Sequence, residues 1–125
     1  MQLNPNLCRI QPPVSKTVRG YEVFVRQLNG LQQIQLDADL MSIREKFTEE
    51  DETNLTQAQM MERFLYATAA RVKHHIVLED GTPLFQNQSL DEIINNNAPD
   101  WIDALYQAID TDTETTTLSE AEKNS

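Results

Sequence analysis

The stretch that decides the fold reads AARVKHHIVLEDGTPLF and spans residues 69–85. Its first half continues a stripe of apolar side chains at steps of three or four residues, which predicts an amphipathic helix. The stripe consists of Ala58, Met61, Leu65, Ala69, Val72 and Ile76. The second half predicts a tight turn, because Asp80-Gly81 favours positive φ angles. Leu84 and Phe85 return after this turn, and Phe85 is expected to anchor the core.

The start of this helix carries strong local signals. Thr56 and Gln59 have the spacing of a capping box, and Leu55 and Met60 have that of a hydrophobic staple. The helix also contains small residues at Ala67, Ala69 and Ala70. These small side chains predict a close approach by another helix.

An earlier helix is predicted over residues 28–47, with two apolar stripes on nearly opposite sides. The first stripe is Leu31, Ile34, Ala38 and Met41, and the second is Leu36, Leu40, Ile43 and Phe47. An ordinary surface helix needs only one such stripe. Either the helix is sandwiched between neighbours, or one stripe faces a partner. We take the second stripe as the candidate partner-binding site.

The remaining segments predict one short strand and two further helices. Residues 21–26 alternate bulky β-forming residues with charge, so they predict a strand. Ser89 and Glu92 form a second capping box, and the helix that they open is expected to end at residues 95–97, which are all Asn. Pro99 suits the first turn of a final helix. The buried face of that helix is expected to be Trp101, Leu105 and Ala108, flanked by Ile102 and Ile109.

These elements predict a mainly α fold with minor β structure. Residues 1–18 form a Pro-rich arm, residues 19–110 a small helical domain, and residues 111–125 a disordered acidic tail. The domain is expected to contain a short N-terminal strand and a β-turn or hairpin between its second and third helices. A chain of 125 residues supports one domain of this size.

The net charge of −10 limits the classes of partner. It argues against nucleic acid and against anionic membranes, both of which attract clustered Lys and Arg. The charge is also uneven along the chain. Residues 49–52 contribute −4, and residues 110–125, with five acids and one base, contribute another −4. The rest of the chain, with 11 acids and 9 bases, carries only −2.

The sequence contains no constellation typical of catalysis, metal binding or cofactor binding. Cys8 is the only cysteine and lies in the Pro-rich arm. Side chains of the adjacent His74 and His75 point about 100° apart on a helix, so they cannot share an ion. The acidic run Glu49–Glu52 lacks the spacing of a calcium loop. Three glycines form no phosphate-binding loop. We therefore expect a non-enzyme with no cofactor and no metal, in the cytoplasm, since no signal peptide or membrane span is evident.

The order of these motifs resembles the tail assembly chaperones of long-tailed bacteriophages and prophages. The resemblance covers roughly residues 19–110 and rests on three segments: Val25-Arg26-Gln27-Leu28 before the first helix, the stretch 69–85, and the Ser89-capped short helix. In that family an Arg-rich helix end runs into a similar acidic turn. The Asn95–Asn97 run, Trp101 and the Pro-rich arm depart from the family pattern.

The resemblance implies a chaperone that binds the tape-measure protein, keeps it soluble and helps to recruit major tail (tube) protein subunits. Such a protein acts in the cytoplasm of the bacterial host and is absent from the mature virion. A longer, frameshifted form of the chain is a further implied partner, and a homo-oligomer is an open possibility. In this role the second stripe, Leu36, Leu40, Ile43 and Phe47, would hold a partner helix.

Two other function classes compete with this interpretation. An acidic inhibitor that mimics DNA would place carboxylates in rows over a rigid surface, whereas the charge here is concentrated in one loop and one tail. An enzyme or small-molecule binding domain has no motif in its support.

Overall fold

The computed structural model describes residues 4, 9–48 and 56–109. Within these residues the chain forms three strands and four helices, so the predicted fold class, mainly α with minor β, is confirmed. The elements are, in order, β1 (Val14–Val18), β2 (Tyr21–Val25), α1 (Gly30–Thr48), α2 (Gln57–His75), β3 (Ile76–Val77), α3 (Leu90–Asn96) and a final helix over residues 99–109. None of the helices described is long and apolar enough to cross a membrane.

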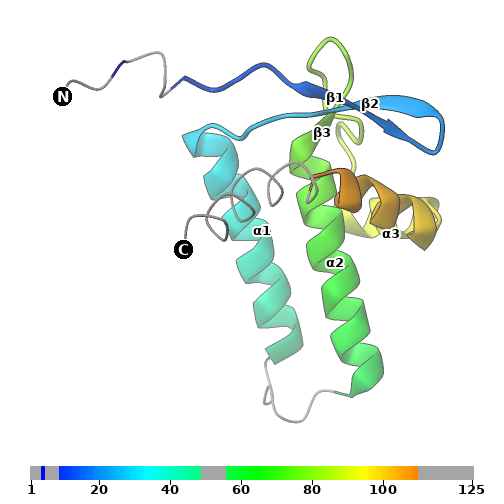
Figure 1. Ribbon diagram of the computed structural model, residues 1–125. Coiled ribbons are helices and arrows are strands. Elements are labelled where there is room, and N and C mark those ends of the chain that lie inside the picture. Colours follow the sequence, from blue (N-terminus) through cyan, green and yellow to red (C-terminus); the bar gives the residue numbers. More distant parts are fainter. Residues whose placement is uncertain (1–3, 5–8, 49–55, 110–125) are drawn as a thin grey trace, which may run out of the picture.

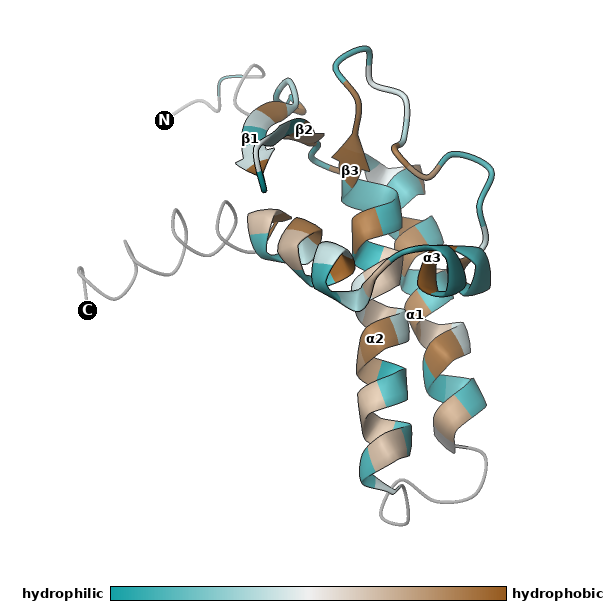
Figure 2. Ribbon diagram, turned by 90° about the vertical axis from the view of Figure 1, so that its right-hand side faces the viewer, coloured by the Kyte–Doolittle hydropathy of each residue, from teal (hydrophilic) through white to brown (hydrophobic). Residues whose placement is uncertain are grey.

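The two long helices form an antiparallel pair that organises the molecule (Figure 1). The strands lie across one end of this pair, and α3 and the final helix pack against the same half of α2. The C-terminal half of α1 and the N-terminal half of α2 project beyond this body (Figures 1 and 2). The described chain is therefore a packed body with a two-helix extension.

The strands form one antiparallel sheet in the order β1-β2-β3. The turn between β1 and β2 is Arg19-Gly20, with φ angles of 51° and 86°. Two positive φ angles match the twist of a tight hairpin. The predicted strand at residues 21–26 is confirmed as β2, whereas the arm predicted over residues 1–18 includes the whole of β1. The strand β1 has the sequence VSKTV, whose polar centre Ser15-Lys16-Thr17 gives no clear strand pattern, and its stability depends on pairing with β2.

The predicted turn after α2 is also confirmed. The Leu78 amide donates to the Thr82 carbonyl at 2.7 Å, and the Leu84 amide donates to the Ile76 carbonyl at 3.1 Å. Gly81 has a φ of 90°, which a residue with a Cβ adopts only under strain. The turn returns Phe85 to the core, where its side chain is buried.

Three helices begin with reciprocal side-chain caps. In the capping box of α2, the Gln59 amide donates to Thr56 Oγ1 at 3.1 Å and the Thr56 amide donates to Gln59 Oε1 at 2.9 Å. Ser89 and Glu92 cap α3 in the same way, so both predicted capping boxes are confirmed. An unpredicted third pair, Asn29 and Gln32, exchanges equivalent bonds at the start of α1. Leu55, the outer half of the predicted staple, lies outside the described residues.

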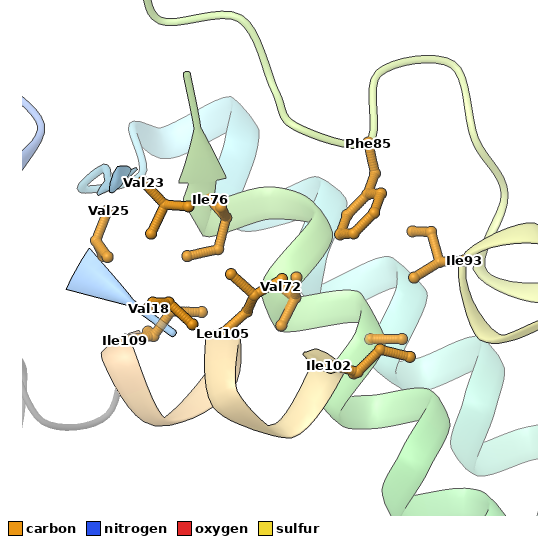
Figure 3. Close-up of a cluster of buried hydrophobic side chains, with 11 residues drawn as sticks. Val18, Val23, Val25, Val72, Ile76, Phe85, Ile93, Ile102, Leu105 and Ile109 are labelled. Carbon is orange, nitrogen blue, oxygen red and sulfur yellow. The ribbon is translucent and has the colours of Figure 1, made fainter. Parts of the chain in front are cut away.

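The main core gathers side chains from the sheet, from α2 and from both C-terminal helices (Figure 3). Val72, Ile76 and Ile93 are fully buried at its centre. The buried face of the final helix differs from the predicted one. It consists of Ile102, Leu105 and Ile109, while Trp101 and Ala108 are only half-buried. Trp101 lies instead beside the hairpin, with its ring 5.8 Å from that of Tyr21 and the Arg19 guanidinium 5.3 Å from its centroid.

Arg26 ties the sheet to the end of α2. Its Nε donates to the His74 carbonyl at 2.7 Å, and its backbone amide donates to the His75 carbonyl at 2.9 Å. The last carbonyls of a helix have no partner within the helix, and a cation there also interacts favourably with the helix dipole. The arginine in the segment Val25-Arg26-Gln27-Leu28 therefore caps α2 from a distant part of the sequence.

We expect Arg26→Gln to lower the free energy of unfolding by about 2 kcal/mol, because it removes a charged hydrogen bond to a partly buried carbonyl. Urea unfolding followed by circular dichroism measures this change. Arg9→Gln is the matched control, since Arg9 is exposed, and should change stability by less than about 0.5 kcal/mol. Equal effects of the two substitutions would contradict a capping role for Arg26.

Candidate partner-binding site

The histidines have structural partners and do not converge. His74 Nε2 lies 2.7 Å from Asp39 Oδ2, which links α2 to α1. His75 Nδ1 donates to the Arg26 carbonyl at 3.0 Å. The side chain of His74 is buried, at 8% exposure, and that of His75 is half-buried. Among the described residues no three potential ligands lie close enough to hold a metal ion. Cys8 and the acidic run Glu49–Glu52 lie outside them.

Burial lowers the pKa of His75 below its ordinary value of 6.5. The hydrogen bond to Arg26 opposes this shift, while the nearby charges of His74, Arg26 and Arg71 add to it. A carbonyl oxygen only accepts, so the neutral ring carries its proton on Nδ1. The folded state therefore favours neutral His75, and this preference gives stability a pH dependence.

The second stripe of α1, proposed above for partner binding, packs inside the molecule. Leu36 and Ile43 are buried against Ala70 of α2, and Leu40 and Phe47 are half-buried beside them. Of the two stripes of α1, the second is therefore the one that packs against α2, and it forms the seam between the two helices. As a binding site it stays a prediction, and a partner would reach it only if the helices separated.

The outer end of this seam is closed by an aromatic and polar cluster. The Phe47 and Tyr66 rings lie 5.9 Å apart, and Lys46 Nζ lies 4.4 Å from the centre of the Tyr66 ring. The Tyr66 hydroxyl donates to Asp91 of α3, and this bond is the main reason that the pKa of Tyr66 is raised. These contacts connect α1, α2 and α3, and they further restrict access to the second stripe.

The opposite stripe of α1 faces solvent. Leu31 is 74% exposed, Ile34 63% and Met41 62%. Sequence periodicity finds both stripes but does not say which one α2 covers. The first stripe is therefore an available apolar surface.

A second apolar surface is concave and lies between α2 and the final helix. This α2 groove, of about 640 Å³, is lined by Gln57, Met60, Met61, Phe64, Leu65 and Thr68 of α2 and by Pro99, Asp100, Ile102 and Asp103 of the final helix. Met60, Met61 and Phe64 are each more than half exposed. In Figure 2, hydrophobic segments occur along the projecting half of α2 as well as in the body.

The α2 groove was missed partly because two of its lining residues, Met61 and Leu65, belong to the same stripe that builds the core. Met61 and Leu65 have helical spacing with Ala69 and Val72, and the whole run was predicted as one apolar stripe of an amphipathic helix. In the structure Ala69 and Val72 are buried, Leu65 is half-buried and Met61 is exposed. Exposure therefore changes along a single stripe, at the point where α3 and the final helix stop covering it.

This architecture is similar to that of a solved structure, the tail assembly chaperone of bacteriophage HK97. The TM-score is 0.54, over 81% of this chain and 84% of that one. The two proteins share a fold. Their sequences are only 16% identical, and no family model and no curated protein matches this chain in sequence. The resemblance to tail assembly chaperones seen in the sequence motifs is thus confirmed at the level of the fold.

The two stripes of α1 predict responses of very different size to the same kind of substitution. Ile43→Asp places a carboxylate in the seam and should destabilise the fold by about 3–5 kcal/mol. Ile34→Asp, on the same helix but exposed, should cost no more than about 1 kcal/mol. Urea unfolding measures both. If Ile43→Asp left stability unchanged, the assignment of the second stripe to the core would fail.

The lowered pKa of His75 predicts the sign of a pH effect. The unfolded chain binds the proton more readily, so the contribution of neutral His75 is complete above about pH 6.5 and is lost as the pH falls through the folded pKa. The stability advantage of the unsubstituted protein over His75→Gln should therefore shrink between about pH 7.5 and pH 5. An advantage that stayed constant or grew in acid would contradict this.

Proposed function

We propose that the chain is a phage tail assembly chaperone that binds the tape-measure protein, keeps it soluble and helps to recruit tube subunits. The observation that carries this proposal is the fold shared with the HK97 chaperone, combined with large apolar side chains left in solvent along both long helices. Its place of action would be the cytoplasm of the bacterial host, and it would be absent from the finished virion.

The distribution of exposed apolar residues supports a role in holding another protein. Apolar residues scattered singly over a surface are ordinary, but neighbouring ones that line a groove typically mark an interaction site. Met60, Met61 and Phe64 occupy three positions within two turns of α2. These side chains are arranged as a binding surface would require.

The charge distribution supports the same role. The described residues contain 11 acidic and 9 basic side chains, so the folded body is close to neutral. Most of the net charge of −10 belongs to residues 49–52 and 110–125. Charged segments attached to a neutral body favour solubility while an apolar surface is unoccupied.

The same distribution gives little support to DNA mimicry. Such a mimic needs an excess of carboxylates over the folded surface, whereas nine basic residues offset most of the acids there. The proposal also includes no catalytic step and no cofactor. The groove is lined by apolar side chains, two aspartates and two neutral polar residues, which suits contact with a protein better than turnover of a substrate.

The other implied partners extend this proposal. The major tail protein would be recruited while the tape-measure protein is held, and a longer product of translational frameshifting would share residues of the short form. Glu122-Lys123-Asn124 can be encoded by an A-rich run of the slippery type, and reading the gene there for a slip site and an overlapping frame tests this partner directly.

The main test is co-expression with a tape-measure protein from the phage or prophage genome in which this chain is found. We expect the tape-measure protein to move from the insoluble to the soluble fraction and to co-purify with the chain. An unrelated aggregation-prone protein of similar length serves as the control and should stay insoluble. If the tape-measure protein were equally insoluble with and without the chain, the proposed function would be wrong.

A further inference from the structure

We propose that the α2 groove binds one face of a basic amphipathic helix in the client protein. This inference rests on the proposed function for the existence of a client, but its chemistry comes from the groove alone. The occupant is defined by three properties of the site: its apolar floor, its length and shape, and its charge.

The floor of the groove is apolar and able to adapt to different side chains. Met60 is 51% exposed, Met61 65% and Phe64 62%, so much apolar area remains to be buried. Methionine side chains are flexible and polarizable, and they repack around varied partners. The one buried hydroxyl, that of Thr68, donates to the Phe64 carbonyl at 2.8 Å and needs no further partner. The floor therefore favours aliphatic or aromatic anchors over a polar ligand.

The dimensions and walls of the groove suit a helix. Its α2 wall runs from Gln57 to Thr68, which is about 16 Å of helix axis, or three turns. A partner helix of this length presents anchors at positions i, i+3, i+4 and i+7. Both walls are helices, whose backbone groups are largely used within the helix, so the groove offers no strand edge that an extended peptide would join.

The charge of the groove selects a cationic helix. Asp100 and Asp103 lie one turn apart on the second wall, both exposed, and no cation pairs with either carboxylate among the described residues. The lining contains no Lys or Arg. Lysine or arginine beside the apolar anchors would pair with these aspartates, while an acidic helix would be repelled.

The same aspartates argue against a second copy of the chain as the occupant. A two-fold contact places the same surface of both subunits together. Here it would bring four carboxylates into one apolar interface with no basic lining residue to offset them. A cationic client avoids this cost.

The direct test uses the intact protein with ¹³C-methyl-labelled methionine and a synthetic peptide probe. The probe is a Leu/Lys amphipathic helix of about 18 residues, long enough to be helical. We expect the methyl signals of Met60 and Met61 to shift on titration, while that of Met41, on the outer face of α1, stays in place. No shift at Met60 and Met61 with about 1 mM probe would overturn the proposal.

Two matched pairs of variants test the apolar and the charged parts separately. Met61→Glu should weaken binding of the Leu/Lys probe at least about tenfold, whereas Met41→Glu, equally exposed, should not. Asp100→Asn with Asp103→Asn should weaken it about tenfold at low salt, and Asp37→Asn with Glu62→Gln should leave it unchanged. A Leu/Gln probe should not respond to the aspartate substitutions. Equal binding of Leu/Lys and Leu/Glu probes would overturn the charge assignment.

Co-expression separates failure of this inference from failure of the proposed function. If the unsubstituted chain solubilises the tape-measure protein and Met61→Glu does not, although it is folded by circular dichroism, the groove is the client site. If both solubilise it equally, the groove proposal is wrong and the proposed function stands. If Met61→Glu instead breaks an oligomer seen by analytical ultracentrifugation and the probe does not bind, the groove is a self-interface and the proposal is overturned.

Discussion

The structure depends on the direct passage of α2 into β3. His75 is the last helical residue and Ile76 is the first residue of the strand, so no loop separates the two. Ile76 and Val77 are fully buried, and both pair with β2. The end of the long helix is therefore fixed to the sheet. The turn that follows β3 must return Phe85 to the same core. Arg26, which directly follows β2, caps the end of α2.

Local rules predicted the elements whose stability is decided within a few residues. The caps at Thr56 and Ser89 and the turn at Asp80-Gly81 depend on side chains one to three positions apart, and all three are present. The strands β1 and β3 depend on pairing with β2, which short polar or two-residue segments do not reveal. The choice between the α1 stripes was likewise non-local. It was decided by Ala70, whose small, fully buried side chain lets Leu36 and Ile43 pack closely on α2.

The candidate site arises because the apolar stripe of α2 is longer than the helices that cover it. The apolar stripe of α2 extends along the whole helix, but α3 has only seven residues, and α3 and the final helix cover only part of it. Buried positions such as Val72 therefore pass into exposed ones such as Met61 without any change in the sequence pattern. Periodicity alone reports that a surface is apolar. The length and placement of α3 and the final helix decide which residues of the α2 stripe are buried in the core and which line the groove.

The energetics of this groove favour reversible binding. Full burial of a large apolar side chain contributes about 1.5–3 kcal/mol, and Met60, Met61 and Phe64 are already partly buried, so these three offer a few kcal/mol to a partner. Association costs at least about 4 kcal/mol in lost freedom, so one groove holding one helix binds weakly. A long client with several such helices would engage several copies of the chain, each dissociating independently. In the proposed function, weak individual contacts would protect a client along its length and would still allow each copy to be displaced when tube subunits assemble on that client.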